Sequence, residues 1–354
     1  MAIAVGNSIA LTSDPLKDGL LQGGSWTFAG ERVVTYSLNL NFDINHQGQV
    51  VPAPGGTWEA SPGMTDAFTR AIAAWANVID VRFQKVTSGS YVFESTADIA
   101  VALTGTDLQR AGNIAMGLFP DPATARSLIS DFGYSAAQYP RPEGDVFLDN
   151  FYSGFSYLND GGLALWAIIH ELGHALGLKH PHDDGGTGRP DFGQLGLTKA
   201  NGGPYDDERF TVMSYSPESY YSLSQHQGAG HAATPMPLDI LAMQRIYGAN
   251  LAFHSGDDVY APVVDHAMRT IWDGGGSDTL DISAIATDVA LDLRPGALMD
   301  LEPGTAVANA FGTALEIRSE TILGIAYNCI IENAIGGNGN NLITGNDAGW
   351  IGEH

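Results

Sequence analysis

The strongest pattern in the chain is an eleven-residue stretch with three histidines, His170-Glu171-Leu172-Gly173-His174-Ala175-Leu176-Gly177-Leu178-Lys179-His180. Residues four apart share one face of a helix, so His170 and His174 are predicted to point at one metal ion. Gly177 can adopt a positive φ and end the helix, which lets the chain turn back and bring in His180 as a third ligand. Imidazole nitrogen suits zinc, and three protein ligands leave a position open, as in catalytic zinc sites.

Glu171 is the candidate general base. It follows His170 by one residue and is offset around the helix, so we expect it beside the metal rather than on it. A base in that place can take a proton from a water molecule activated by zinc. The competing interpretation is that these are unrelated histidines on a helix, with no metal between them.

Length and charge limit the classes of function. The chain has 354 residues, which fits two domains, and 44% of them are hydrophobic, which excludes global disorder. Acidic residues outnumber basic ones 40 to 16, for a formal charge of −24, which argues against nucleic acid or an anionic membrane as partner. Residues 251–354 hold 15 acids and 3 bases, so this part is predicted to bind cations or simply to favour solubility.

Cys329 is the single cysteine, so no intrachain disulfide can form and calcium becomes the expected stabiliser of a secreted protein. The first 17 residues have no basic region ahead of an apolar core and do not resemble a cleavable signal peptide. The apolar run 163–169 is too short to cross a bilayer.

The order of predicted elements indicates an α+β domain followed by a β-rich one. Apolar residues at spacings of three and four predict helices over 66–79 and 163–177, and a proline followed by a final glycine predicts a helix over 237–247. Strands are predicted over 33–40, 98–103, 114–119 and 146–148, and a long surface loop over 185–205. Beyond residue 250 the pattern changes to short β segments between Gly and Asp, so the predicted domains are 1–249 and 250–354.

The eleven-residue motif, followed by Thr211-Val212-Met213-Ser214-Tyr215, resembles the metzincin metallopeptidases, and the Met-Ser-Tyr turn is similar to that of the serralysin family. The resemblance implies that Met213 lies beneath the metal site. It also implies that Tyr215 is a switchable fourth zinc ligand, able to leave the metal and donate a hydrogen bond to a developing oxyanion. Taken alone, Met213 is an ordinary core residue and Tyr215 an ordinary buried tyrosine.

The resemblance also implies a substrate cleft. Metzincins hold substrate as an added antiparallel strand, and residues 112–120 resemble the sheet edge that receives it. Ser216-Pro217-Glu218 would line the specificity pocket. The alternative for residues 112–120 is an edge strand with no ligand.

The C-terminal part contains a candidate calcium constellation. Asp273-Gly274-Gly275-Gly276-Ser277-Asp278 places two carboxylates among three glycines, which suits an ion that takes six to eight oxygens. The resemblance to serralysins, whose roll repeat is of the RTX type, implies ligands for two ions and a weaker third. The ligands of the first ion would be the His254, Gly256 and Gly275 carbonyls, with Asp258, Asp273 and Asp278. The ligands of the second would be Gly276, Asp278, Ile330 and Glu332. The weak third ion would be bound by Gly337, Gly339 and Asn341. Asn341 departs from the repeat, which has aspartate there, and the alternative for all of these segments is acidic turns without an ion.

The resemblance therefore implies a metzincin catalytic domain, with a twisted mixed sheet and an active-site helix, followed by a β-sandwich or short β-roll. It implies a secreted, extracellular, monomeric zinc endopeptidase with one catalytic zinc and two or more structural calcium ions. Its partners would be protein or peptide substrates and a proteinaceous inhibitor, with no nucleic acid or membrane. Two alternatives stay open: a calcium-dependent binding or adhesive module with an inactive protease-like domain, and a zinc hydrolase acting on something other than peptide.

Overall fold

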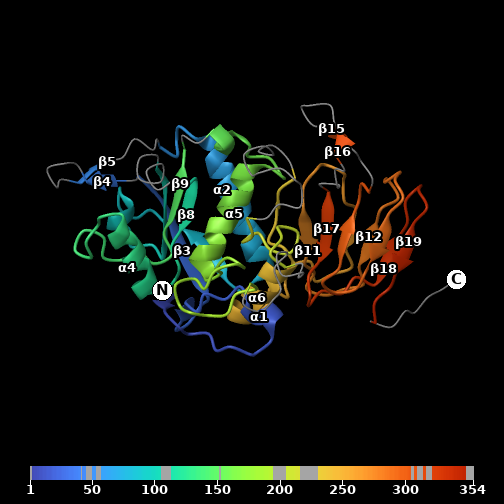
Figure 1. The fold of residues 1–354 in the computed structure, drawn as a ribbon, viewed down its shortest axis with the longest axis horizontal. Helices are drawn as coiled ribbons and strands as arrows, with labels where there is room; N and C mark the ends of the chain where they lie inside the picture. The colour runs from blue at the N-terminus through green and yellow to red at the C-terminus, as the bar shows by residue number, and fades with distance from the viewer. Residues whose placement is uncertain are drawn as a thin grey trace.

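A computed structural model of the chain describes residues 2–40, 42–44, 50–52, 57–104, 113–150, 153–193, 205–215, 230–303, 307–308, 314–315 and 321–347. A few helices and a mixed sheet occupy one end, and several small sheets occupy the other (Figure 1). This bears out the α+β class. Within the described residues, no helix is long and apolar enough to cross a membrane.

The helices are α1 (Pro15–Asp18), α2 (Pro62–Val78), α4 (Pro122–Asp131), α5 (Leu163–Leu176) and α6 (Pro237–Tyr247), with 3-10 turns at Val92–Glu94 and Ser153–Ser156. The N-terminal strands are β1 (Ala2–Val5), β2 (Ser25–Phe28), β3 (Val33–Leu40), β4 (Phe42–Ile44), β5 (Val50–Pro52), β6 (Arg82–Lys85), β7 (Ile99–Thr104), β8 (Ala115–Gly117) and β9 (Val146–Asp149). The C-terminal strands are β10 (Val259–Tyr260), β11 (Arg269–Ile271), β12 (Thr279–Asp281), β13 (Ala290–Asp292), β14 (Leu298–Asp300), β15 (Val307–Ala308), β16 (Ala314–Leu315), β17 (Ile322–Ile325), β18 (Asn333–Ile335) and β19 (Leu342–Thr344).

The main sheet has the order β6-β3-β7-β9-β8, and only its edge strand β8 runs antiparallel to its neighbour. Every residue of β7 is buried, because both faces of the sheet are covered. Ile99, Val101 and Leu103 join the core that contains α2 and α5, whereas Ala100 and Ala102 join a smaller core with α4. The sheet therefore separates α4 from α5 (Leu163–Leu176).

Helix α5 is the central element of this end of the molecule, and all 14 of its residues are buried. It packs between α2 and β8 (Figure 1), and the Trp75 indole of α2 donates a hydrogen bond to the Ile169 carbonyl at 3.1 Å. Gly177 ends the helix with φ 113°. A side chain there would collide with the Gly24 carbonyl oxygen, 2.5 Å from an added Cβ, so glycine is required both for the turn and for the space.

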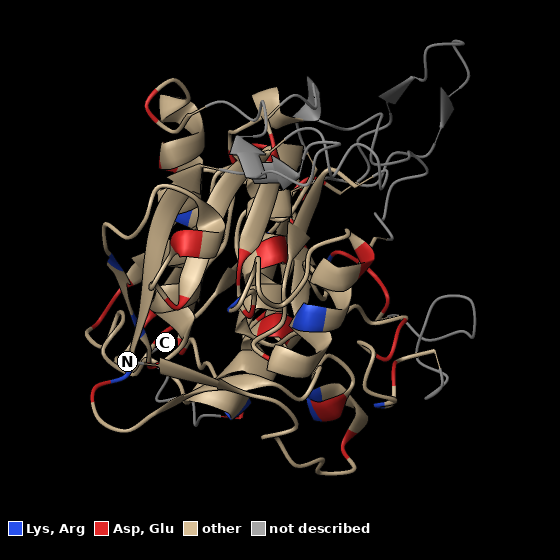
Figure 2. Ribbon diagram, turned by 90° about the vertical axis from the view of Figure 1, so that its left-hand side faces the viewer, with Lys and Arg blue, Asp and Glu red and all other residues tan. Residues whose placement is uncertain are grey.

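The C-terminal strands form small, mostly parallel ladders: β10-β12-β18, β13-β19 and the mixed β11-β17-β14. One continuous hydrophobic core links these strands to α2, α5 and α6. The domain boundary between residues 249 and 250, just after α6, stays a prediction. Figure 2 shows acidic residues at many places along the ribbon with few basic residues among them, in keeping with the ratio of 40 to 16.

Candidate metal centre and active site

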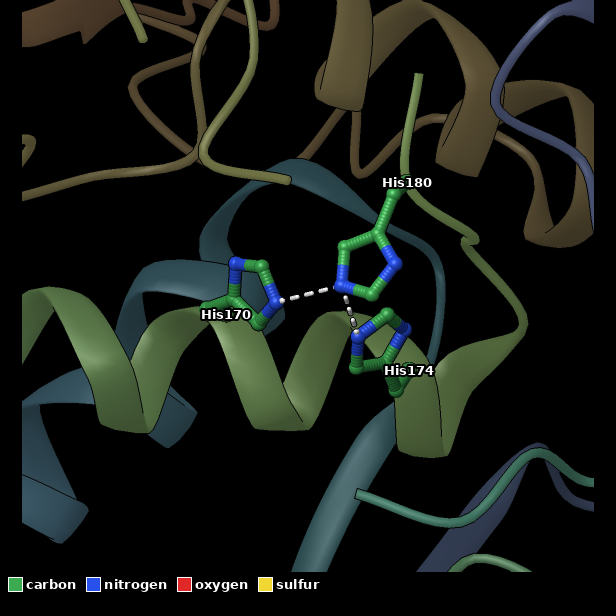
Figure 3. Close-up of side chains that lie close together, drawn as sticks. All are labelled: His170, His174 and His180. Carbon is green, nitrogen blue, oxygen red and sulfur yellow. Dashed lines mark hydrogen bonds between the residues drawn. The ribbon is translucent and has the colours of Figure 1, made fainter. Parts of the chain in front are cut away.

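Three histidine rings converge beside α5 (Figure 3). His170 and His174 lie one turn apart on the helix, and His180 returns to them from the loop that follows Gly177. The Nε2 atom of His180 lies 3.2 Å from Nε2 of His170 and 3.1 Å from Nε2 of His174. The structure thus brings together all three predicted zinc ligands.

The opposite nitrogen of each ring faces an oxygen atom. The Nδ1 contacts are His170 to the Val212 carbonyl at 2.7 Å, His174 to the Leu178 carbonyl at 2.8 Å, and His180 to Asp183 Oδ2 at 2.5 Å. These oxygens can only accept, so each Nδ1 carries a proton and each Nε2 of a neutral ring carries a lone pair. The same second contact orients metal-bound histidines in proteins generally.

Burial keeps two of these rings neutral. It lowers the pKa of His170 well below the usual range and that of His174 to about 3, and the neighbouring histidines act in the same direction. In the neutral His170 and His174 rings with Nδ1 protonated, each Nε2 atom carries a lone pair and faces Nε2 of His180. Converging lone pairs at 3.1–3.2 Å repel one another unless a cation lies between them, so this donor set fits zinc.

Glu171 is buried beside this cluster, against the edge strand. Burial raises the pKa of Glu171 to about 8, and a hydrogen bond from the Gly117 backbone acts in the opposite direction. A Cβ added to Gly117 would lie 2.2 Å from the Glu171 carbonyl oxygen. Glycine is therefore needed for β8 to lie so close to α5.

The register of β8 leaves part of its backbone facing away from the sheet. Leu118 N–H donates to the Asp145 carbonyl at 2.8 Å, and Asp149 N–H donates to the Ile114 carbonyl at 3.0 Å. Hydrogen-bonded positions alternate along an antiparallel pair, so the backbone groups of Ala115 and Gly117 point away from β9. Gly112, the first residue of the predicted substrate edge, lies outside the described residues.

Met213 lies against helix α5, next to Gly173, and its place beneath a metal ion stays a prediction from the resemblance. Its Sδ atom is 2.6 Å from the position of a Cβ added to Gly173, so Gly173 makes room for the methionine between the two ligand turns. Asp239 of α6 holds the turn in place. Its fully buried carboxylate accepts hydrogen bonds from Thr211 Oγ1, Val212 N–H and Met236 N–H at 2.6, 2.7 and 2.8 Å.

The Tyr215 ring lies among the histidine rings. It stacks on His170 with centroids 5.3 Å apart and lies 4.6 Å from His180. Burial of the hydroxyl, and then the charge of Glu171, raise the pKa of Tyr215, although 46% of the residue remains exposed. Its role as a zinc ligand stays a prediction, and Ser216-Pro217-Glu218 lie outside the described residues.

Asp183 and Asp239 were not predicted as site residues. A carboxylate three residues after His180 was the available signal for Asp183, which can also form a second metal-ligating group with His180 and His182. No local signal marks Asp239, because its partners in the turn lie 27 and 28 residues away.

The predicted first calcium site is brought together in part. Ligand atoms of His254, Asp258 and Asp273 lie within 4.8 Å of one another. His254 enters this group through its imidazole, with Nδ1 3.1 Å from Asp258 Oδ1, whereas the prediction used its carbonyl. The two oxygens of Asp273 accept hydrogen bonds from the Gly275 N–H at 2.6 Å and the Tyr260 hydroxyl at 2.5 Å.

Asp278 connects the two predicted strong sites. Its Oδ1 accepts the Asp258 N–H and its own N–H donates to Glu332 Oε2, both at 2.8 Å. Its Oδ2 is buried, with no hydrogen-bond donor among the described residues. Burial, with the charges of Asp273 and Glu332, raises the pKa of Asp278 to about 6. A buried carboxylate oxygen without a donor fits a calcium ion.

Two predicted glycines, Gly256 and Gly276, lie close to each other beside Asp278. Gly276, with φ 157°, lies so close to the Gly256 carbonyl that an added Cβ would be 2.0 Å from that oxygen. Ile330 lies two residues before Glu332 with an exposed side chain.

At the predicted weak site, the Asn341 side-chain amide donates to the carbonyls of Gly337 and Gly339 at 2.8 and 3.1 Å. Those two carbonyls are therefore already paired without an ion.

Comparisons with known proteins agree with this geometry. The family model described as the peptidase M10 serralysin C-terminal domain matches residues 238–350. Serralysin of Proteus mirabilis is 33% identical over 295 residues, which are 79% of this chain and 53% of that protein. Serralysin G of Dickeya chrysanthemi is 27% identical over a match that covers 97% of this chain and 66% of that protein. Metalloprotease AprA of Pseudomonas entomophila is 27% identical over a match that covers 80% of this chain and 56% of that protein. The chain thus spans about half to two thirds of these curated relatives, and it belongs to the serralysin family.

Proposed function

We propose that this protein is a zinc-dependent endopeptidase. The observation that carries the proposal is the convergence of three Nε2 atoms at 3.1–3.2 Å, each on a ring whose Nδ1 faces an acceptor. The names of the relatives, serralysin and metalloprotease, favour the same activity. His170, His174 and His180 would hold one zinc ion.

A zinc ion at this place supplies Lewis-acid polarisation of the scissile carbonyl and increases the acidity of a water molecule. The Glu171 carboxylate then accepts the proton of the attacking water and passes it to the leaving amine. The Tyr215 hydroxyl donates a hydrogen bond to the oxyanion of the tetrahedral adduct. The Gly117 N–H orients Glu171 for this work.

The substrate would be an extended peptide paired with β8. The outward backbone groups of Ala115 and the Gly117 carbonyl can exchange hydrogen bonds with any peptide main chain, whereas the Gly117 N–H is already donated to Glu171; this favours proteins of varied sequence as substrates. The same edge lies directly beside Glu171, so a peptide paired there would pass the base. This pairing distinguishes peptide hydrolysis from zinc chemistry on other substrates.

The finer fold assignment is also a proposal: a metzincin catalytic domain over 1–249 and a calcium-binding β domain over 250–354. The parallel ladders β10-β12-β18 and β13-β19 favour a short β-roll. The buried Asp278 oxygen, which has no donor in the part of the chain that the structure describes, favours calcium between the segments of the C-terminal part. Secretion, a monomeric state and regulation by an inhibitor protein stay predictions from the family resemblance.

The test combines metal analysis with proteolysis on one sample. We expect about one zinc per chain, casein hydrolysis that disappears on zinc chelation at saturating calcium, and recovery of activity on adding zinc back. Repeating the zinc chelation at limiting calcium distinguishes the effect of losing zinc from the effect of losing calcium. A folded, zinc-loaded chain that leaves casein intact would instead favour the adhesive module with an inactive protease-like domain.

A further inference from the structure

Lys179, the residue before the third predicted ligand, is fully buried. Its ammonium nitrogen donates to three backbone carbonyls, those of Gly19 at 2.6 Å, Asp183 at 2.7 Å and His180 at 3.3 Å. An ammonium group has three donors, and burying one is costly unless they are all used, as they are here. The lysine therefore joins the loop that carries His180 to a segment 160 residues earlier in the chain.

That segment, Asn7–Gly24, is called here the N-terminal segment, and residues Gly177–Phe192 are called the ligand loop. Their backbones pair directly: Lys179 N–H donates to the Leu20 carbonyl at 2.8 Å, and Gln22 N–H to the Gly177 carbonyl at 3.0 Å. Side chains of the ligand loop add two further contacts, from Thr187 Oγ1 to the Gln22 carbonyl at 2.9 Å and from Arg189 Nη2 to Asn7 Oδ1 at 3.0 Å.

The two segments also touch through van der Waals contact. A Cβ added to Gly19 would lie 1.9 Å from Cε1 of Phe192, whose side chain is fully buried. The Phe192 N–H donates to the Pro181 carbonyl at 2.8 Å, and Pro181 follows His180 directly. A side chain added at position 19 would therefore displace Phe192, and the displacement would pass through Pro181 to the third predicted ligand, His180.

We infer that Lys179 is a positioning residue for the metal centre, and that the N-terminal segment belongs to the support of that centre. Lys179 holds the Asp183 backbone to the Gly19 carbonyl, and the Asp183 carboxylate in turn receives Nδ1–H of His180. Loosening these contacts should lower zinc affinity although no ligand is changed. The inference rests on the proposed zinc site, and loss of such outer contacts typically costs 10–100-fold in metal affinity.

Two variants from different segments test it, each with a matched control. Lys179→Met removes the ammonium but keeps an unbranched chain, and its control is Lys85→Met, at an exposed lysine outside both segments. Gly19→Ala pushes on Phe192 from a helical backbone position, and its control is Gly30→Ala, where an added Cβ meets nothing within 4 Å. For each protein we would measure zinc affinity by chelator competition, the cobalt(II) absorption spectrum, and thermal unfolding of the zinc-free form.

We expect Lys179→Met and Gly19→Ala to bind zinc roughly 10- to 100-fold more weakly, with altered cobalt spectra, while both controls match the original protein. Unchanged zinc affinity and cobalt spectrum in folded Lys179→Met would overturn the inference. If that variant does not fold, Gly19→Ala decides by the same criterion.

One measurement needs no variant. Because coupling between two sites is reciprocal, zinc should slow amide exchange at Gln22 and Lys179 in the unaltered protein, and no change there would overturn the inference. Failure of the unaltered chain to bind zinc at all would refute the proposed function instead, so the two failures are distinguishable.

Discussion

The Nδ1 atom of His180 lies 2.5 Å from Oδ2 of Asp183, which makes this carboxylate the partner of the third predicted ligand. Its other oxygen accepts the Gly185 N–H at 2.8 Å, so the carboxylate is held from both ends. The contact with His180 lowers the pKa of Asp183 to about 2 against the opposing effect of burial. Asp183 is therefore ionised throughout the neutral range and always available as the acceptor.

Replacing Asp183 with Ala should weaken zinc binding by roughly 10- to 100-fold, because His180 loses the group that orients its ring. Chelator competition measures this directly. Asp131→Ala, at the end of α4, provides a control at an exposed aspartate. Equal zinc affinity in Asp183→Ala and the control would mean that the ligand loop holds His180 by itself.

Replacing Glu171 with Gln should leave zinc bound and reduce the turnover number by roughly 10²-fold or more, because a similar shape no longer accepts a proton. Casein hydrolysis and metal content are measured on the same preparation. Proteolysis near the original rate in a folded, zinc-loaded variant would remove Glu171 from the mechanism.

Gly117→Ala tests the close approach of the substrate edge to the active-site helix. The new Cβ would meet the Glu171 carbonyl oxygen at 2.2 Å, and backbone cannot yield as a flexible side chain does. We expect loss of most peptidase activity with zinc still bound, because β8 and its peptide partner are pushed away from Glu171. The variant Gly30→Ala is the control for the added methyl group, and full activity in Gly117→Ala would show that the edge strand does not need this position.

Tyr215→Phe removes one hydroxyl from the site. Zinc should stay bound through the three histidines, and the turnover number should fall by roughly 10- to 1000-fold, the upper part corresponding to loss of one oxyanion donor. An unchanged turnover number would leave Tyr215 as a ring that only packs on His170.

Calcium removal should lower the melting temperature. The acids Asp273, Asp278 and Glu332 lie close together, and without a cation their charges repel. Calcium bound only by the folded form adds stability by mass action. The measurement is thermal unfolding with a calcium-selective chelator, with zinc content checked afterwards. A melting temperature that stays constant in a calcium-free sample would contradict a structural role for the ion.

The active-site helix and the order of the main elements could be predicted from the sequence because their signals are local. Helix spacing and a terminal glycine predict the bounds of α5 to within one residue, and the predicted helix over 237–247 coincides with α6. The helix predicted over 66–79 in fact begins at Pro62, directly after Ser61, and α4 was not predicted although Asp121 and Pro122 mark its start. Proline at the first helical position was a usable signal in both cases.

The support of the metal centre could not be predicted, because it depends on contacts between distant segments. Lys179 appears in the sequence as an ordinary charged residue beside a motif, and its burial depends on Gly19 in the N-terminal segment. Asp239 holds Val212, and Val212 in turn accepts Nδ1–H of His170. Neither relationship has a fixed spacing along the chain that a motif could record.

The uninterrupted hydrophobic core has a practical consequence for enzymology. It runs from Trp75 and Met213 near the histidines to Ile271 and Ile325 in the C-terminal strands. If the whole core unfolds as one cooperative unit, every ion bound to the native chain shifts the same unfolding equilibrium towards the native state. Near the melting temperature, a calcium chelator would then resemble a slow inhibitor of peptide cleavage. The apparent inhibition would reflect the fraction of native chain that remains rather than any event in the cleft.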